Sequence, residues 1–258
     1  MSNQPLTEAN ELGKLLLQAG IALIKAGAGT NRVVMNVMRL AGAYGYEAQV
    51  DMGTRYINVS LHSKEQENIY SGSRTISSLP GANFKTIAEI SSLSWAVTEK
   101  KMTVSEAGME LEKVIHLPEY HRSIVLVLVG LAGSSFCYTF GGNAVEMGIT
   151  FLATVAGLFC KQELIRKKFN PYLVTYCSAL LAALIIGIGW KAGIGSRLDH
   201  AFATCILFLI PGVPLINSIL DIIDGYILNG IDRGINGIIH AFAIACGLAT
   251  IIYIFQVQ

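Results

Sequence analysis

Charged residues are scarce in this sequence. They make up 14% of its 258 residues, whereas an average soluble domain carries about 25%. The deficit is uneven, because charges are frequent up to Arg122 and nearly vanish from Ser123 onward, apart from short clusters between apolar runs. This break predicts two domains, a soluble one over residues 1–118 and a membrane one over residues 119–258. The net charge of only +1 gives no field that would attract nucleic acid, so no nucleic-acid partner is expected.

Residue sets typical of disulfides, metal sites and hydrolases are also missing. All five cysteines lie in the apolar half and none forms a C-x-x-C pair, so we interpret them as small residues that face lipid or core. His62, His116 and His121 lack metal-ligand spacing, and there is no G-x-S-x-G elbow. We therefore expect no metal, no cofactor and no enzymatic activity.

The first apolar stretch does not have the pattern of a signal peptide. Glu8 and Glu11 open it, and Lys14 and Lys25 bracket it. A signal peptide needs a basic start, an unbroken apolar core and a small-residue cleavage site. The N-terminal domain is therefore expected to stay in the cytoplasm.

Apolar periodicity in the first 118 residues predicts a small α+β domain. A helix capped by Thr7 should end at Gly27 and Gly29, and a second, capped by Thr30, should cover residues 31–44. Thr103 and Glu106 have the spacing of a capping box. The remaining expected elements are a hairpin over 48–52 and 56–61, a third strand over 69–75, and helices over 82–99 and 104–116.

The run Gly27-Ala28-Gly29-Thr30-Asn31-Arg32 has some likeness to a phosphate-binding loop. It lacks the G-x-x-x-x-G-K-[ST] spacing and does not follow a strand. We interpret it as a turn between two helices, with phosphate binding as the lesser alternative.

Five stretches after residue 122 are long and apolar enough to cross a bilayer. They cover residues 123–140, 144–160, 172–190, 201–220 and 235–255. Small residues recur at four-residue spacing within them, as at Gly130 and Ser134, which allows close helix packing in lipid. The expected fold is therefore a bundle of about five transmembrane helices preceded by the small cytoplasmic domain.

Basic residues predict the orientation of this bundle. The loop after the second stretch holds Lys161, Arg166, Lys167 and Lys168, whereas the loop over residues 141–143 has no charge. The positive-inside rule then places the N-terminus in the cytoplasm and, with five spans, the C-terminus outside.

The fourth stretch carries the functional hypothesis. Pro211 and Pro214 flank Gly212 and Val213 inside an apolar run, and each proline removes a backbone donor. Broken helices of this kind form binding sites in many transporters. We expect these residues to open the helix so that its backbone can line a site.

Polar side chains follow the break in helical register. Asn217, Asp221 and Asp224 are separated by four and three residues and should share one face with Pro214. A carboxylate inside a bilayer is costly and therefore suggests function. We expect Asp221 to carry or couple a proton, with Asn217 binding substrate or supporting the carboxyl and Asp224 as a further residue of the coupling site. In the alternative, both aspartates lie beyond the bilayer at the start of a cytoplasmic loop that runs to Asp232 and Arg233, and the prolines only mark a kink.

The sequence from Pro211 to Asn217, followed by Asp221 and Gly225, resembles the signature of the threonine/serine exporter family. The stretch 27–33 resembles that family's N-terminal region, and the order of soluble domain and five spans also matches. The resemblance implies proton-coupled export of small polar metabolites, either threonine and serine or dicarboxylates such as succinate. The family signature maps onto Pro211, Gly212, Pro214, Asn217 and Asp221 more firmly than onto Asp224.

The chain stops where longer members continue into a second membrane half, so it is similar to the larger component of a split exporter. That implies a separate small membrane protein as partner. It also implies a multi-pass protein of the cell membrane, specifically of a bacterial inner membrane. Homo-oligomers and hetero-oligomers both stay open. Lys191 and Arg197 are candidate anion-attracting groups, though better explained as loop residues. Two other functions stay open: a sensory or structural membrane protein, and a membrane-anchored enzyme.

Overall fold

The computed structural model describes residues 4–63, 68–77, 81–118, 120–194 and 198–256. The chain divides into two compact units. The first, here the N-terminal unit, comprises Met1–Pro118 and Val213–Ile235; the second, here the membrane unit, comprises Glu119–Gly212 and Asn236–Gln258. Residues 213–235 thus group with the N-terminal segment. The predicted boundary between a soluble domain and a membrane domain at residue 118 stays a prediction.

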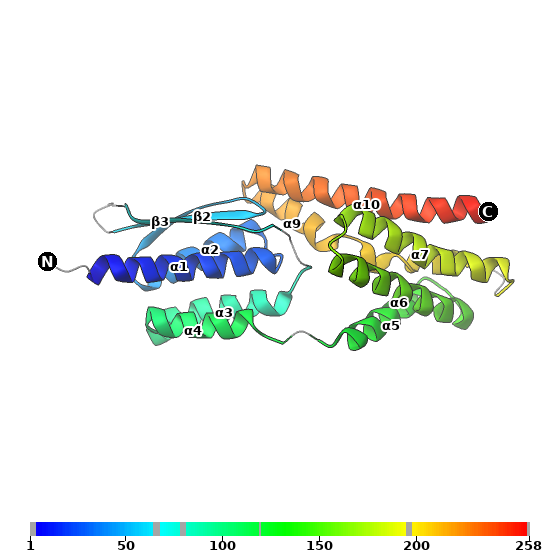
Figure 1. Cartoon of the computed structure of the whole chain (residues 1–258), viewed down its shortest axis with the longest axis horizontal. Helices are drawn as coiled ribbons and strands as arrows, with labels where there is room; N and C mark the ends of the chain where they lie inside the picture. Colours follow the sequence, from blue (N-terminus) through cyan, green and yellow to red (C-terminus); the bar gives the residue numbers. More distant parts are fainter. Residues whose placement is uncertain (1–3, 64–67, 78–80, 119, 195–197, 257–258) are drawn as a thin grey trace. The chain divides into compact units, whose positions relative to one another are not determined.

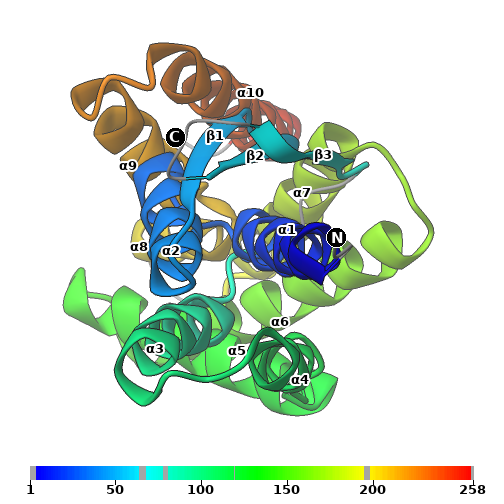
Figure 2. The same ribbon diagram turned by 90° about the vertical axis from the view of Figure 1, so that its left-hand side faces the viewer.

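Seven elements build the first 118 residues. They are α1 (Gln4–Lys25), α2 (Thr30–Ala43), β1 (Glu47–Met52), β2 (Tyr56–His62), β3 (Asn68–Thr75), α3 (Phe84–Lys100) and α4 (Val104–Ile115). The strands form one antiparallel sheet in the order β1-β2-β3. Figures 1 and 2 show three layers within this unit: the sheet lies on α1 and α2, and α3 and α4 cover their other side.

An apolar core fills the space between these layers. Alternate residues of β2, namely Ile57, Val59 and Leu61, are fully buried, as expected for a strand with one face on a core. Leu16 and Leu23 of α1 are buried in the same cluster. The expected hairpin, third strand and helices are therefore present close to their predicted ranges.

Two predicted helix caps are wrong, and one is confirmed. Helix α1 begins at Gln4, so Thr7 lies inside it. Gly29 is the N-cap of α2, and Thr30 is the first helical residue, with its hydroxyl bonded to Asp221. The capping box of Thr103 and Glu106 is present as predicted.

The remaining helices include the candidate membrane spans. They are α5 (Arg122–Thr139), α6 (Ala144–Arg166), α7 (Pro171–Lys191), α8 (Asp199–Thr204), the 3-10 turn η1 (Leu207–Leu209), α9 (Gly212–Ile223) and α10 (Ile227–Phe255). Among the described residues, α5, α6, α7 and α10 are long and apolar enough to cross a membrane, with a fifth span if the broken pair α8–η1 and α9 counts as one. The chain is a mostly helical protein with four to five candidate spans.

Several helix ends differ from the predicted ranges. Helix α6 continues to Arg166, so Lys161 is helical, and α10 begins at Ile227 rather than near residue 235. The fourth predicted stretch is not one helix, since helical structure stops at Leu209 and resumes at Gly212. The predicted loop through residues 232 and 233 is replaced by the first turns of α10.

Candidate functional site

The predicted helix break lies at the proline pair. Pro211 stands between η1 and α9, and Gly212 is the first residue of α9. Pro214 falls in the first turn of α9, where backbone N–H groups have no intrahelical acceptor, so its missing donor costs little. The prolines thus set the start of a new helix.

Helix α9 is amphipathic. Asn217, Ser218 and Asp221 lie on its polar side, whereas Ile219 and Ile223 are exposed. The polar side faces other parts of the N-terminal unit, because each of these three residues is bonded to a segment of that unit.

Asp221 is the centre of the polar contacts. Its side chain is 1% exposed and accepts two hydrogen bonds from Thr30, one from the backbone N–H to Oδ1 and one from the hydroxyl to Oδ2, both at 2.9 Å. Arg233 Nε lies 2.9 Å from Oδ2 and forms an ion pair with it. The two Thr30 groups and the Arg233 guanidinium are all donors, and they complement a negatively charged carboxylate.

Thr30 is well placed to bind a carboxylate because it opens α2. The first N–H groups of a helix lack intrahelical acceptors and carry partial positive charge, so a helix N-terminus favours an anion. Here the anion is supplied by Asp221, from 191 positions further along the chain.

Side chains of α9 and α10 also bind the turn before α2 and the first residue of α2. Asn217 donates to the Gly27 carbonyl at 2.9 Å, and Arg233 Nη2 donates to the Ala28 carbonyl at 3.0 Å. Asn229 donates to the Thr30 hydroxyl at 3.2 Å and also to the carbonyl of Met52. We call Thr30, Asn217, Asp221, Asn229 and Arg233 the carboxylate cluster. It joins the turn before α2 to both α9 and the start of α10.

Close packing of α9 on α10 supports this cluster. Ser218 donates to the Gly230 carbonyl at 2.6 Å. A Cβ added at Gly230 would lie 2.7 Å from the Ser218 carbonyl oxygen, and one added at Gly234 would lie 2.8 Å from the Ser218 hydroxyl. Glycine at these positions therefore lets the two helices approach, which places Asp221 and Arg233 side by side.

Of the six predicted site residues, the structure brings Asn217 and Asp221 into one cluster. Asp224 is exposed in the turn after α9 and lies outside it. Lys191 is exposed at the end of α7, and Arg197 lies outside the described residues. The roles assigned to these residues in coupling or binding stay predictions.

Sequence reasoning missed three members of the cluster. Thr30 was predicted to cap its own helix, Arg233 was placed in a loop, and Asn229 was not singled out. The available signal was the pair of family-like stretches, 27–33 and 211–225, since the structure joins residues of both.

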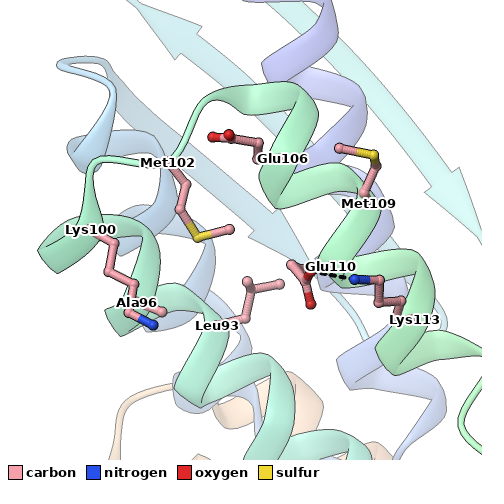
Figure 3. Close-up of a pocket in the computed structure, with 8 residues that line it drawn as sticks. All are labelled: Leu93, Ala96, Lys100, Met102, Glu106, Met109, Glu110 and Lys113. Atoms are coloured by element: carbon pink, nitrogen blue, oxygen red, sulfur yellow. Dashed lines mark hydrogen bonds and ion pairs between the residues drawn. The ribbon is translucent and has the colours of Figure 1, made fainter.

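A separate hollow in the N-terminal unit lies between α3 and α4 (Figure 3). Its lining mixes apolar side chains such as Leu93 and Met102 with charged ones, including the ion pair of Glu110 and Lys113. No predicted site residue lines it, and no group of three metal-ligating side chains occurs in the described part of the chain. This hollow therefore adds no argument for metal or substrate chemistry.

Several long apolar helices in the described part of the chain, together with a helix interrupted at a proline pair, indicate a multi-pass membrane protein. Residues 14–255 match the family described as "Putative threonine/serine exporter", and the chain belongs to that family. This confirms the resemblance noted in the sequence.

Two curated relatives are similar to the chain over most of their length. Both are named "Probable succinate transporter subunit YjjP". The protein from Klebsiella aerogenes is 24% identical over 228 residues, which cover 88% of this chain and 87% of the relative. The one from Escherichia coli (strain K12) is 25% identical over 222 residues, or 85% of each chain. No solved structure matches the chain.

Proposed function

We propose that this chain is the larger subunit of a proton-coupled exporter of small polar metabolites, and that a small membrane protein supplies the rest of the exporter. The substrates are threonine and serine or small dicarboxylates such as succinate. Family membership and the word "subunit" in the names of both relatives support this assignment. The N-terminal domain faces the cytoplasm, from which substrate is taken.

The observation that carries the proposal is the buried carboxylate of Asp221 at the N-terminus of α2, paired with Arg233. A substrate carboxylate has the same charge and acceptor geometry, so it competes with Asp221 for the Thr30 N–H and the guanidinium. Protonation of Asp221 removes its charge and weakens the same contacts.

Both events act on the link between the turn at residues 27–30 and α9. With the carboxylate cluster intact, α9 and α10 are tied to α2. When Asp221 leaves, the contact between α9 and Thr30 is lost, and the Nε of Arg233 becomes available to a substrate carboxylate. Asp221 thus couples protonation and substrate binding to a change in how α9 is held.

The test is efflux of preloaded, labelled threonine, serine and succinate from cells that express the chain with and without the small membrane partner. We expect efflux that needs both chains and is lost in Asp221→Asn. Asp51→Asn is the matched control, since Asp51 is an exposed aspartate of the same unit that accepts a hydrogen bond from Asn58 and lies outside the carboxylate cluster. Undiminished efflux in Asp221→Asn removes the carboxylate from the mechanism.

Asp224→Asn tests the other predicted carboxylate. Because Asp224 is exposed and outside the cluster, we expect it to retain efflux. Loss of efflux in Asp224→Asn alone would shift the coupling role to that residue. No efflux of any of the three substrates, with both proteins confirmed in the membrane, contradicts the assigned substrate class.

A further inference from the structure

A second buried carboxylate lies in the membrane unit, on α6. Glu146 is 2% exposed, and its two oxygens have different partners. Oε2 accepts the backbone N–H of Asn143 at 2.9 Å and completes a capping box, whereas Oε1 lies 3.2 Å from His200 Nδ1 of α8. A capping box requires only the first of these contacts. The contact with His200 therefore needs another explanation.

Two further polar groups continue along α6 from Glu146. Thr150 and Thr154, one and two turns on, are fully buried, and neither hydroxyl has a hydrogen-bond partner among the residues that the structure describes. Other hydroxyls in the membrane unit donate to the carbonyl four residues back, as do those of Thr139, Thr175, Ser178, Thr204 and Thr250. An unpaired buried hydroxyl costs about 1–3 kcal/mol, so these two hydroxyls differ from the others in this unit.

Helix α5 leaves room for one of these hydroxyls. A Cβ added at Gly133 would lie 2.6 Å from Thr154 Oγ1, so only glycine permits the observed packing. Gly133 itself is buried in α5. The hydroxyl of Thr154 is thus accommodated by the neighbouring helix.

Three helices that pack on α6, namely α5, α7 and α8, carry further ionisable groups. Helix α8 contributes His200, which is partly exposed, and the exposed Asp199. Cys137 of α5 lies against Gly142, just before the capping box. Lys191 of α7 is exposed, with its ammonium group 5.9 Å from the ring centroid of Phe255. Of these, the structure shows only His200 in contact with the carboxylate.

We propose that Glu146 and His200 form a proton-binding site in the membrane unit, and that Thr150 and Thr154 extend it as a polar path along α6. The partly exposed imidazole exchanges protons with water, and the buried carboxylate takes the proton from it. No bond other than N–H and O–H is made or broken, and the proton moves from imidazolium to carboxylate. This site is distinct from the carboxylate cluster of the N-terminal unit.

This role of the Glu146–His200 site rests on the proposed function, because the site would supply the proton that drives export. The test uses the chain and its partner in proteoliposomes with a pH-sensitive dye inside. Exchange of labelled for unlabelled substrate across the membrane requires no net proton movement, whereas export driven by a proton gradient does. We expect Glu146→Gln and His200→Gln to keep exchange and to lose gradient-driven export and proton flux.

Glu106→Gln is the matched control, because Glu106 completes the capping box of α4, is exposed and contacts Thr103 rather than a histidine. Glutamine serves in a capping box as glutamate does, so both variants should fold. Gradient-driven export that survives in Glu146→Gln overturns the proposal. Equal loss of exchange and of driven export in that variant also overturns it, because this indicates a structural defect.

A second measurement does not depend on transport. Infrared difference spectra of the purified chain in lipid, recorded on acidification, should contain a carboxylic-acid band that Glu146→Gln removes and Glu106→Gln does not remove. If wild type neither exchanges nor exports substrate, the proposed function fails, while this band still decides the proton site. Absence of a band assigned to Glu146 refutes the site even if transport is found.

Discussion

Thr30 binds both oxygens of the Asp221 carboxylate, Oδ1 through its backbone N–H and Oδ2 through its hydroxyl, each at 2.9 Å. The two residues belong to the two family-like stretches of the sequence, 191 positions apart. One residue at the start of a helix thus supplies two donors to a carboxylate on a distant helix. This contact makes the first turn of α2 part of the candidate functional site.

The Thr30 hydroxyl can be tested separately from the N–H. Thr30→Val removes the hydroxyl donor but keeps the backbone bond, and it also removes the acceptor of Asn229. Hydrogen bonds to charged groups contribute about 1.5–3 kcal/mol, so we expect a lower unfolding temperature for the full-length protein in detergent. Thr30→Ser should lie close to wild type. Equal behaviour of valine and serine variants would show that the hydroxyl is not needed.

Arg233 is expected to matter more for stability than Asp221. Arg233→Met leaves the buried Asp221 carboxylate without its cationic partner, and breaking a buried pair in this way costs about 3–5 kcal/mol. The double variant Asp221→Asn, Arg233→Met should recover part of the loss. A thermal-unfolding double-mutant cycle measures the coupling. Purely additive effects would contradict a direct interaction between the two side chains.

Packing of α9 on α10 predicts a steric effect at Gly230. A methyl group there would meet the Ser218 carbonyl oxygen at 2.7 Å, so Gly230→Ala must push α9 away from α10. We expect it to reduce both stability and efflux. Gly108→Ala in α4 is the control, since its Cβ would meet nothing within 4 Å and alanine favours a helix. If both variants behave alike, close approach of the helices is not required.

Thr154→Val separates stability from transport. It replaces an unpaired buried hydroxyl with a methyl group, which is nearly neutral or stabilising for the fold. We expect an unchanged or higher unfolding temperature together with slower proton-driven export and normal substrate exchange. A variant that exports at the wild-type rate would remove Thr154 from the proton path.

The capping box of α4 predicts a local effect of pH. Bonds from the backbone N–H and the hydroxyl of Thr103 lower the pKa of Glu106 from its usual 4.5. The stabilising contribution is therefore present above pH 4.5 and is lost as the pH falls through the lower pKa of the folded state. Hydrogen exchange at the first turn of α4 should increase in that acidic range. Glu106→Gln, which has no carboxyl to titrate, should show no such change.

Local rules predicted much of the fold. The alternation of apolar and polar residues predicted the hairpin, and the spacing of Thr103 and Glu106 predicted a capping box that is present. The proline pair revealed the helix break, because its effect on backbone hydrogen bonding is independent of the rest of the fold. These features depend on residues within a few positions of each other.

The candidate site depended on long-range contacts and was predicted only in part. Asp221 and Asn217 could be named because a carboxylate and an amide stand out in an apolar run. Their partners could not be named, since no spacing rule connects Asp221 to Thr30 or Asn217 to Gly27 across about 190 positions. The predicted Thr30 cap was also wrong: the helix begins at Thr30 itself, and the Thr30 hydroxyl donates to a distant carboxylate instead of accepting from its own helix.

The separation between Thr30 and Asp221 also has a consequence for how the protein is made. The ribosome releases α1 to α4 first, and domains fold as their sequence emerges. The N-terminus of α2 then has to wait for α9 and α10, which are synthesised only after α5, α6 and α7. Until that moment the turn at residues 27–30 lacks its carboxylate and its arginine. The last third of the chain therefore completes a unit that the first third begins, and insertion of the helices and maturation of the N-terminal segment become one assembly step.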